Sequence, residues 1–538
     1  MAIENRIRPR ERGGTRFEDD VDPTAKHWRW TILSSLADYI DAASIVAGAA
    51  GLALWSKQFG MSSTTIGLLA ALSSNAISCG VGALIGGRLG DKYGRKRIYS
   101  LDLLVYIVGV LIIVFAANVT MLFVGYIIVG LAVGADVPTS WSLIAEFSPQ
   151  RARGKMMGLT NIFWYIGPIV TLLLALAFAP LGLLGIRLLF VHLALVAAVT
   201  WWLRRGIIES PRFTAMAEEE HAAAEAQVEE AGTRRNHGRT GALDKLAGIE
   251  GQGAARARHS AVRELLSPAH RKALLFAFGT FCLWNIPAGT YGFFLPFIIK
   301  NSGQTSQAVS VGIDALWFGS AILAVAFIFM RINDRVNRAA LYGITALIQA
   351  AGFWIFVFVS PNLIGWAIVN VLLFGIGQGA GQWPLNRVWS VELFPTRVRN
   401  TAQGMIFGSM RLVLGVWSFF VPTLLGCTMD STGSLSGCST SGFHTMFLIL
   451  SVMLTVTAAI GWIWGPRTEG MSLEEIQDAR EAGPRGLRLR SRRIVRLPQR
   501  TDEDGAPARK SGCSRSVWRR TGSSSRACGI ACSAIRAA

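Results

Sequence analysis

Several acidic side chains lie inside long apolar segments of this chain, where charge is costly and rare, and three of them are candidates for proton chemistry. Asp38 and Asp41 fall in the apolar segment 30–55, and Asp136 falls in segment 120–145. A carboxyl group removed from water favours its neutral form, so it can take up a proton on one side of a membrane and release it on the other. We therefore predict proton coupling at Asp41 and Asp136, with Asp38 as a further candidate. The alternative is a structural ion pair with an internal arginine.

Two arginines occupy similarly apolar surroundings. Arg387 lies in segment 363–389 and Arg411 in segment 404–425. The planar guanidinium group suits carboxylates and phosphates, so both side chains are candidates for recognition of an anionic solute. Two alternatives stay open. An internal acid can neutralise each arginine, or the side chain can extend to the nearby membrane surface.

Aromatic and amide side chains supply further candidate contacts. The faces of Trp164, Trp284 and Trp383 could stack on a ring, although tryptophans in apolar segments also serve helix packing and interfacial belts. Asn161 and Gln382 add hydrogen-bonding groups. The predicted solute-binding residues are Asn161, Trp164, Trp284, Gln382, Trp383, Arg387 and Arg411.

One motif occurs twice, with the second copy 246 positions after the first. The shared residues are Pro138, Glu146, Pro149, Arg151 and Arg153 in the first copy, and Pro384, Glu392, Pro395, Arg397 and Arg399 in the second. Each copy follows a long apolar segment, and the shift is close to half the chain. A duplicated half embedded in a membrane is typical of transporters that bind their solute at the interface of two repeats.

The elements that must position these residues are twelve apolar segments. They cover 30–55, 64–86, 99–117, 120–145, 157–179, 184–204, 273–299, 309–330, 340–360, 363–389, 404–425 and 443–465. Each is long enough to cross a bilayer as a helix, the only open-chain structure that satisfies its own backbone in lipid. Only 16% of the 538 residues are charged, against about 25% in soluble proteins.

We predict an all-α membrane protein with two six-helix halves, 30–204 and 271–465. A segment 1–29 precedes them, a linker 205–270 joins them, and a basic tail 466–538, expected to be disordered, follows. An Ala- and Glu-rich run in the linker predicts a short surface helix.

Basic residues concentrate in four alternate loops. They are Arg88, Lys92, Arg95, Lys96 and Arg97; Arg151, Arg153 and Lys155; Arg331, Arg335 and Arg338; and Arg397 and Arg399. The positive-inside rule then places both termini and the linker in the cytoplasm of a multi-pass plasma-membrane protein. The formal charge of +19 sits in these loops and the tail, so we expect no nucleic-acid partner. We expect a monomer without cofactor or metal.

Cys427 and Cys438 share one polar loop that this orientation places outside. Outer compartments are oxidising, so a disulfide between them and two free thiols are both open.

Several loop motifs resemble those of the major facilitator superfamily, and within it the sugar porters. The matching stretches are Gly87-Arg88-Leu89-Gly90-Asp91-Lys92-Tyr93-Gly94-Arg95-Lys96, its degenerate copy Asp334-Arg335-Val336-Asn337-Arg338, the stretch Ile128 to Arg153, Glu209-Ser210-Pro211-Arg212, and the run Pro466 to Glu475. The resemblance implies a latch at the cytoplasmic side that joins the two halves. The residues it implicates are Asp91, Arg95, Glu146, Arg153, Asp334, Glu392 and Arg399.

The solute-contacting positions depart from the sugar-porter pattern. Asn161 stands where that family usually has Gln, the usual Gln pair falls on Leu283 and Trp284, and Arg387 replaces a tryptophan. The resemblance implies a secondary transporter, not an enzyme, for proton-coupled uptake of a sugar, polyol or sugar acid. The alternatives are an organic-anion or phosphate/proton symporter, a proton-driven exporter and a non-transporting membrane sensor. The phosphate alternative rests on Gly134-Ala135-Asp136-Val137-Pro138, which is similar to a motif of phosphate/proton symporters.

Overall fold

The computed structural model describes residues 23–62, 65, 68–69, 71–72, 76–206, 209–219, 222, 225, 261–303, 307–359, 364–424, 428–429, 435–436 and 440–481. The predicted segment 1–29 is therefore described only from residue 23, and most of the linker 205–270 lies outside the described residues. Cys427 and Cys438 also lie outside them, so the question of their disulfide stays as the sequence left it.

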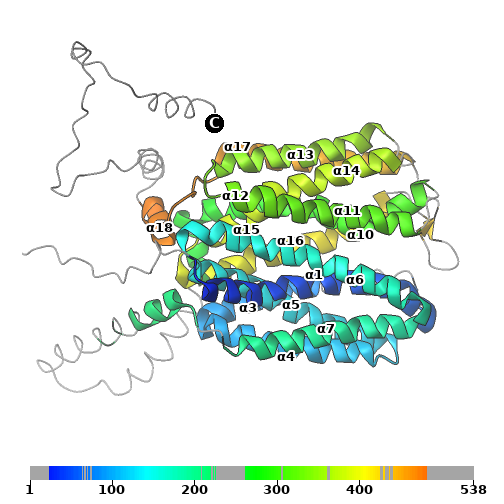
Figure 1. Cartoon of the computed structure of the whole chain (residues 1–538), viewed down its shortest axis with the longest axis horizontal. Helices are drawn as coiled ribbons and strands as arrows, with labels where there is room; N and C mark the ends of the chain where they lie inside the picture. The colour runs from blue at the N-terminus through cyan, green and yellow to red at the C-terminus, as the bar shows by residue number, and fades with distance from the viewer. Residues whose placement is uncertain are drawn as a thin grey trace, which may run out of the picture. The chain divides into compact units, whose positions relative to one another are not determined.

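The first half contains six long helices. They are α1 (Ala25–Phe59), α3 (Ile77–Tyr93), α4 (Arg95–Val114), α5 (Val119–Phe147), α6 (Arg153–Phe178) and α7 (Leu183–Arg204), with short 3₁₀ turns η1 (Gln150–Ala152) and η2 (Ala179–Leu181). In Figure 1 these blue to cyan helices run roughly parallel and lie together.

The second half repeats this arrangement with more interruptions. Its helices are α10 (Pro268–Gly303), α11 (Gln307–Ala324), α12 (Met330–Ile332), α13 (Arg338–Phe358), α14 (Ile364–Gly377), α15 (Trp383–Glu392), α16 (Thr396–Leu424) and α17 (Thr440–Trp464). Two π-helical turns, η3 (Val325–Phe329) and η4 (Gln378–Gln382), join α11 to α12 and α14 to α15. Two short strands, β1 (Thr428–Met429) and β2 (Leu435–Ser436), pair antiparallel between α16 and α17.

The all-helical membrane architecture is confirmed. Eleven helical stretches of the described chain are long and apolar enough to cross a bilayer. The helix at the second predicted span, α3, has 17 described residues, and it packs between α5 and α16. Large apolar side chains such as Leu173, Phe419 and Ile463 are more than 60% exposed, as expected of surfaces that face lipid.

Close helix packing joins the two halves along α3 and α16. A Cβ atom on Gly404 would lie 2.3 Å from the Ala83 carbonyl oxygen, and one on Gly87 would lie 2.6 Å from the Asn400 carbonyl oxygen. Small residues let membrane helices approach to backbone contact. The spacing of the glycines thus fixes where the halves touch.

The turn between α3 and α4 has the tight form that its glycines predict. Gly94 adopts φ 92°, a conformation that favours glycine. Glu209 then accepts hydrogen bonds from the backbone N–H groups of Arg95 and Lys96, both at 3.1 Å, which satisfies the start of α4. Two motifs far apart in the sequence therefore meet at one helix end.

The predicted tail needs a correction. Residues 466–481 are ordered, and they include helix α18 (Leu473–Glu481), which the expectation of a disordered tail from residue 466 missed. Ser472 and Glu475 form a reciprocal capping box at its start, with both hydrogen bonds at 3.0 Å. Residues 482–538 lie outside the described part.

Candidate functional site

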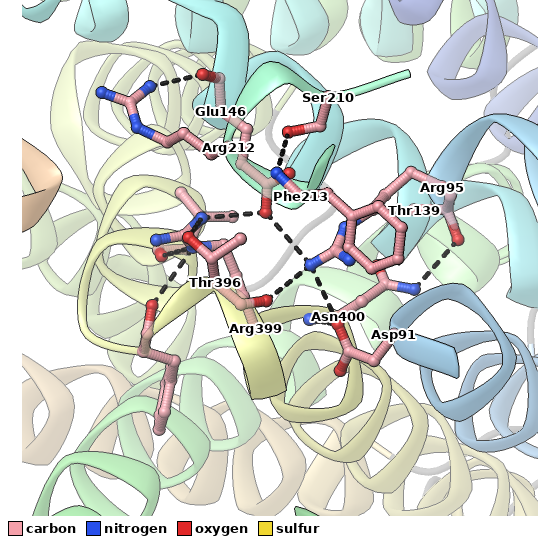
Figure 2. A network of polar contacts seen from close by, with 12 residues as sticks. Asp91, Arg95, Thr139, Glu146, Ser210, Arg212, Phe213, Thr396, Arg399 and Asn400 are labelled. Carbon is pink, nitrogen blue, oxygen red and sulfur yellow. Dashed lines mark hydrogen bonds and ion pairs between the residues drawn. The ribbon is translucent and has the colours of Figure 1, made fainter. Parts of the chain in front are cut away.

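The glutamate of the first motif copy, Glu146, is the centre of a buried charge network, which we call the first latch (Asp91, Arg95, Glu146 and Arg399). Glu146 Oε1 on α5 accepts from Arg95 Nη2 at 3.2 Å and from Arg399 Nη1 at 2.9 Å. Arg399 belongs to α16 of the other half, so this carboxylate joins the two halves (Figure 2). Asp91 pairs with Arg95 at 3.0 Å and also accepts from the backbone N–H groups of Asn400 and Thr401 in the other half.

The second copy forms the second latch (Arg153, Asp334, Arg338 and Glu392). Glu392 accepts from Arg338 Nη1 of its own half at 2.7 Å and from Arg153 Nη1 of the first half at 3.4 Å. Asp334 pairs with Arg338 at 3.2 Å. Burial raises the pKa of the Asp334 carboxyl, although the charge of Arg338 acts in the opposite direction. All seven residues predicted for the latch therefore lie in these two networks, and Arg338 joins them.

An outer layer supports both latches, and sequence reasoning gave it no role. Arg212, in the short helix at 211–219, donates to Glu474 on α18 at 2.8 Å and to the Glu146 carbonyl oxygen. Gln477 on α18 donates to the Glu392 carbonyl oxygen at 3.0 Å. Burial alone would raise the pKa of Glu474, but the hydrogen bonds and charge of Arg212 outweigh it and lower that pKa below its ordinary value. The Glu-Ser-Pro-Arg element and the motif after the last span were the available signals.

Deeper in the bundle, Asp38 and Arg387 form an ion pair between the halves. Arg387 Nη1 lies 2.6 Å from Asp38 Oδ1 and 2.8 Å from Thr160 Oγ1. The Trp141 indole N–H donates to the same carboxylate at 3.2 Å, and its ring faces the guanidinium group. Asp38 and Arg387 are both buried. On α15, Arg387 precedes Glu392 by five residues, which places it about 7.5 Å from the second latch along the helix axis.

A second ion pair of the same kind lies further from the latches. Arg411 Nη2 on α16 lies 3.1 Å from Asp41 Oδ2 on α1, and the Trp164 indole N–H donates to the same oxygen at 3.1 Å. Arg411 follows Arg399 by twelve residues, about 18 Å along the helix. In the structure each of the two arginines is therefore paired with an internal acid, which is one of the alternatives that the sequence left open.

A cavity lies between the halves beside this second ion pair. Its empty space is about 540 Å³, part of which is open to solvent. It is lined by residues of α1, α6, α10, α11, η4, α15 and α16. Of the predicted solute-binding residues, Trp164, Trp383 and Arg411 line it, and the two indole rings lie 4.6 Å apart between centroids.

The other predicted binding residues lie outside the lining of this cavity. Asn161 donates to the Met157 carbonyl oxygen of its own helix at 3.0 Å. Trp284 donates to Gln349 at 3.1 Å, and Gln382 contacts Gln349 and Tyr342. Arg387 lies between the cavity and the second latch, as described above. Their predicted role in binding remains a prediction.

Two amides that the sequence analysis did not select line the cavity, Asn285 and Gln378. Gln378 accepts from the Trp317 indole at 2.7 Å. Its Nε2 atom, like Asn285 Nδ2, is buried and has no hydrogen-bond partner within the described part of the chain. The available signals were a polar side chain one position after Trp284 and the glycine-rich run around Gln378, which forms the π-helical turn η4.

Asp136 pairs with neither Arg387 nor Arg411, the two arginines in apolar segments that the sequence analysis offered as partners. Arg204, the last residue of α7, lies 3.2 Å from its Oδ1 atom. Arg204 is the last residue of the predicted segment 184–204, and the sequence analysis gave it no function. Asp136 therefore belongs to the interior of the first half, whereas Asp38 and Asp41 join the two halves.

Comparison with known proteins agrees with this geometry. Residues 31–422 match the model of the Major Facilitator Superfamily. The minor myo-inositol transporter IolF of Bacillus subtilis is 37% identical over 454 residues, which cover 84% of this chain and 94% of IolF. The niacin transporter NiaP of Acinetobacter baylyi is 24% identical and covers 75% and 86% of the two chains.

The fold is also that of a solved symporter. The structure of the proton:xylose symporter XylE of E. coli superposes with a TM-score of 0.66 at 17% sequence identity, over 84% of this chain and 98% of XylE. These proteins are transporters rather than enzymes. The chain belongs to the Major Facilitator Superfamily, and it is a sugar-porter-like membrane transporter.

Proposed function

We propose that this secondary transporter carries a neutral cyclic polyol, such as an inositol, by alternating access of the cavity between its halves. The observation that carries the proposal is the charge balance around the cavity. Among the described lining residues the arginine is Arg411, which is paired with Asp41, and Arg387 behind it is paired with Asp38. A site whose charges are matched internally favours a solute without net charge.

The remaining lining supports the same class of solute. Asn285 and Gln378 offer amide groups to hydroxyls, and Trp164 and Trp383 offer aromatic faces to the C–H face of a ring. The 37% identity to a myo-inositol transporter across most of both chains supports a polyol over an aldose.

Proton coupling is proposed at the two ion pairs that join the halves. Separation of the halves at this depth would leave buried charges unpaired, at a cost of about 3–5 kcal/mol for each broken pair. A proton on Asp41 or Asp38 would neutralise the carboxylate and remove its attraction to the paired arginine, so protonation would allow the halves to separate. The latches would hold the cytoplasmic side closed, with both termini in the cytoplasm as the positive-inside rule predicts, in a monomer embedded in lipid.

One observation favours a second candidate, an organic anion. Arg411 lines the cavity, and a solute carboxylate could replace Asp41 as its partner once Asp41 is protonated. The likeness to a niacin transporter supports this candidate at a lower identity, 24%.

Uptake into proteoliposomes tests the proposal. We expect an inward proton gradient to drive accumulation of labelled myo-inositol, and unlabelled inositols to compete better than hexuronates, nicotinate or phosphate. Asn285→Ala should raise the KM about tenfold, the effect of losing one buried hydrogen bond of roughly 1.4 kcal/mol.

The comparison variant is Asn161→Ala, which removes the same side chain outside the cavity lining. A KM within about twofold of the wild type would show that Asn161 has no part in binding, whereas a rise similar to that of Asn285→Ala would support its predicted role. Uptake of an anion alone, lost in Arg411→Ala, would replace the polyol with the second candidate. Absence of gradient-driven flux for every solute would overturn coupled uptake.

A further inference from the structure

A polar cluster lies inside the first half, away from the cavity and the latches. It consists of Asp102 on α4, Asp136 on α5 and Arg204 on α7. All three residues are at least 95% buried. The proposed transport cycle assigns no role to Asp102 or Arg204.

The cluster holds one cation and two acids. Arg204 Nη1 contacts both carboxylate oxygens of Asp136, at 3.2 and 3.4 Å, and the same side chain donates to the carbonyl oxygens of Leu33 and Tyr99. The Tyr99 ring lies over the guanidinium group at 3.6 Å. Tyr99 is the other titratable side chain packed against the cluster. Arg204 can therefore balance one carboxylate and not two.

The second acid, Asp102, has no cation of its own. Its Oδ1 atom accepts from the backbone N–H of Leu103 at 2.6 Å, whereas its buried Oδ2 atom receives no hydrogen bond from a donor group in the described part of the chain. The carboxyl groups of Asp102 and Asp136 interact electrostatically with each other and with Arg204. Tyr99, one helical turn before Asp102 on α4, lies over the same guanidinium group, so both acids belong to one buried cluster. Two ionised carboxylates beside one cation would leave a buried charge unbalanced, which favours one proton shared by the pair.

Two hydroxyl groups join the helix turn that follows Asp102 to the helix turn that follows Asp41. Tyr106 follows Asp102 by one helical turn on α4, and Ser44 follows Asp41 by one turn on α1, so each pair shares a helix face. The Tyr106 and Ser44 hydroxyl groups are 2.7 Å apart, and both are buried. Each hydroxyl can accept a proton on one side as it gives up a proton on the other.

We propose that Asp102 and Asp136 form a proton site that holds one shared proton with Arg204 as counter-ion, and that exchanges protons with Asp41 through Tyr106 and Ser44. The exchange part rests on the proposed proton coupling, whereas the occupancy of the site does not. When the pair gives its proton to the ionised Asp41, the cluster gains one negative charge and Asp41 becomes neutral. The return of that proton restores both charges, so one proton moves in each direction.

Infrared difference spectroscopy of the purified protein tests occupancy without any solute. We expect a carbonyl band of a protonated carboxyl group that shifts in heavy water and is lost in both Asp102→Asn and Asp136→Asn. Each single variant keeps one carboxylate for Arg204, so both should fold and bind solute. The double variant leaves Arg204 unpaired and should lose far more thermal stability than the two single losses combined.

Persistence of the band in both single variants would overturn the shared proton, whatever the fate of the transport proposal.

Transport tests the exchange. Tyr106→Phe removes only the hydroxyl group, so the band should remain while proton-driven accumulation falls at least tenfold and solute exchange without a gradient is unchanged. Full accumulation in Tyr106→Phe would overturn the path through this hydroxyl. Loss of exchange along with accumulation would show that the variant damages the carrier itself and would overturn a specific role in proton transfer.

Discussion

The two latches come from one repeated motif, yet they divide their bonds between the halves differently. In both, a glutamate accepts from one arginine of its own half and one of the other half. Glu146 makes its shorter contact, 2.9 Å, to the other half, whereas Glu392 makes its shorter contact, 2.7 Å, within its own half. Asp91 also binds backbone N–H groups across the interface, whereas Asp334 pairs with Arg338 of its own half.

Helix packing beside the latches differs in the same direction. Gly87 meets the backbone of α16 at Asn400 and Gly404. At the corresponding contact of the second copy, Gly158 meets the flexible side chain of Met330. The comparison indicates that the first latch holds the halves together, while the second mainly organises its own half. Three experiments test this division.

The largest effect is expected from the latch glutamates. Glu146→Gln leaves Arg95 and Arg399 buried without a charged partner in common, and loss of such a pair costs about 3–5 kcal/mol. We expect the variant to open at the latch end, measured by distances between spin labels on the two halves. Glu392→Gln should open less and instead lower the thermal stability more. Equal opening in both variants would contradict the division.

A smaller effect is expected from the glycines. A Cβ on Gly87 would lie 2.6 Å from a backbone oxygen, so Gly87→Ala should disfavour the closed state by about 1–3 kcal/mol, roughly 5- to 150-fold in the ratio of closed to open molecules. Gly158→Ala is the matched control. Its Cβ would lie 2.9 Å from Met330 Cγ, which can move aside, so the ratio should change by less than about threefold. The rate at which a cysteine at the latch end is labelled would measure the ratio of closed to open molecules in both variants.

The smallest effect is expected at the outer contact between Arg212 and Glu474. Because Glu474 is about half exposed, the pair is worth at most about 1 kcal/mol. Its pKa is lowered when the latch is closed, so its contribution is complete above the ordinary value of 4.5 and is lost as the pH falls through the lowered value.

Wild type and Glu474→Gln should therefore differ slightly in latch-end distance at neutral pH and converge in acid. A difference in latch-end distance that grows as the pH falls would contradict the assigned direction of the Glu474 pKa shift.

Sequence reasoning found the latch residues because they lie in short continuous motifs, and the resemblance of these motifs to a known family implied a latch at the cytoplasmic side. It failed where partners come from helices far apart in the chain. Nothing in the sequence near Asp136 points to Arg204, 68 residues later, as its counter-ion. Likewise, helix rotation rather than residue type decides that Asn285 lines the cavity and Asn161 does not.

The π-helical turn η4 carries a consequence for the history of the second half. A π-helical turn is the backbone form that a one-residue insertion takes inside an α-helix. Residues 378–382 lie directly before α15, which bears Arg387 and Glu392. Removal of one residue there would restore a regular helix and rotate α15 by about 100° relative to α14. A past insertion at this point would therefore have turned Arg387 toward Asp38 in a single step, without any substitution in α15 itself.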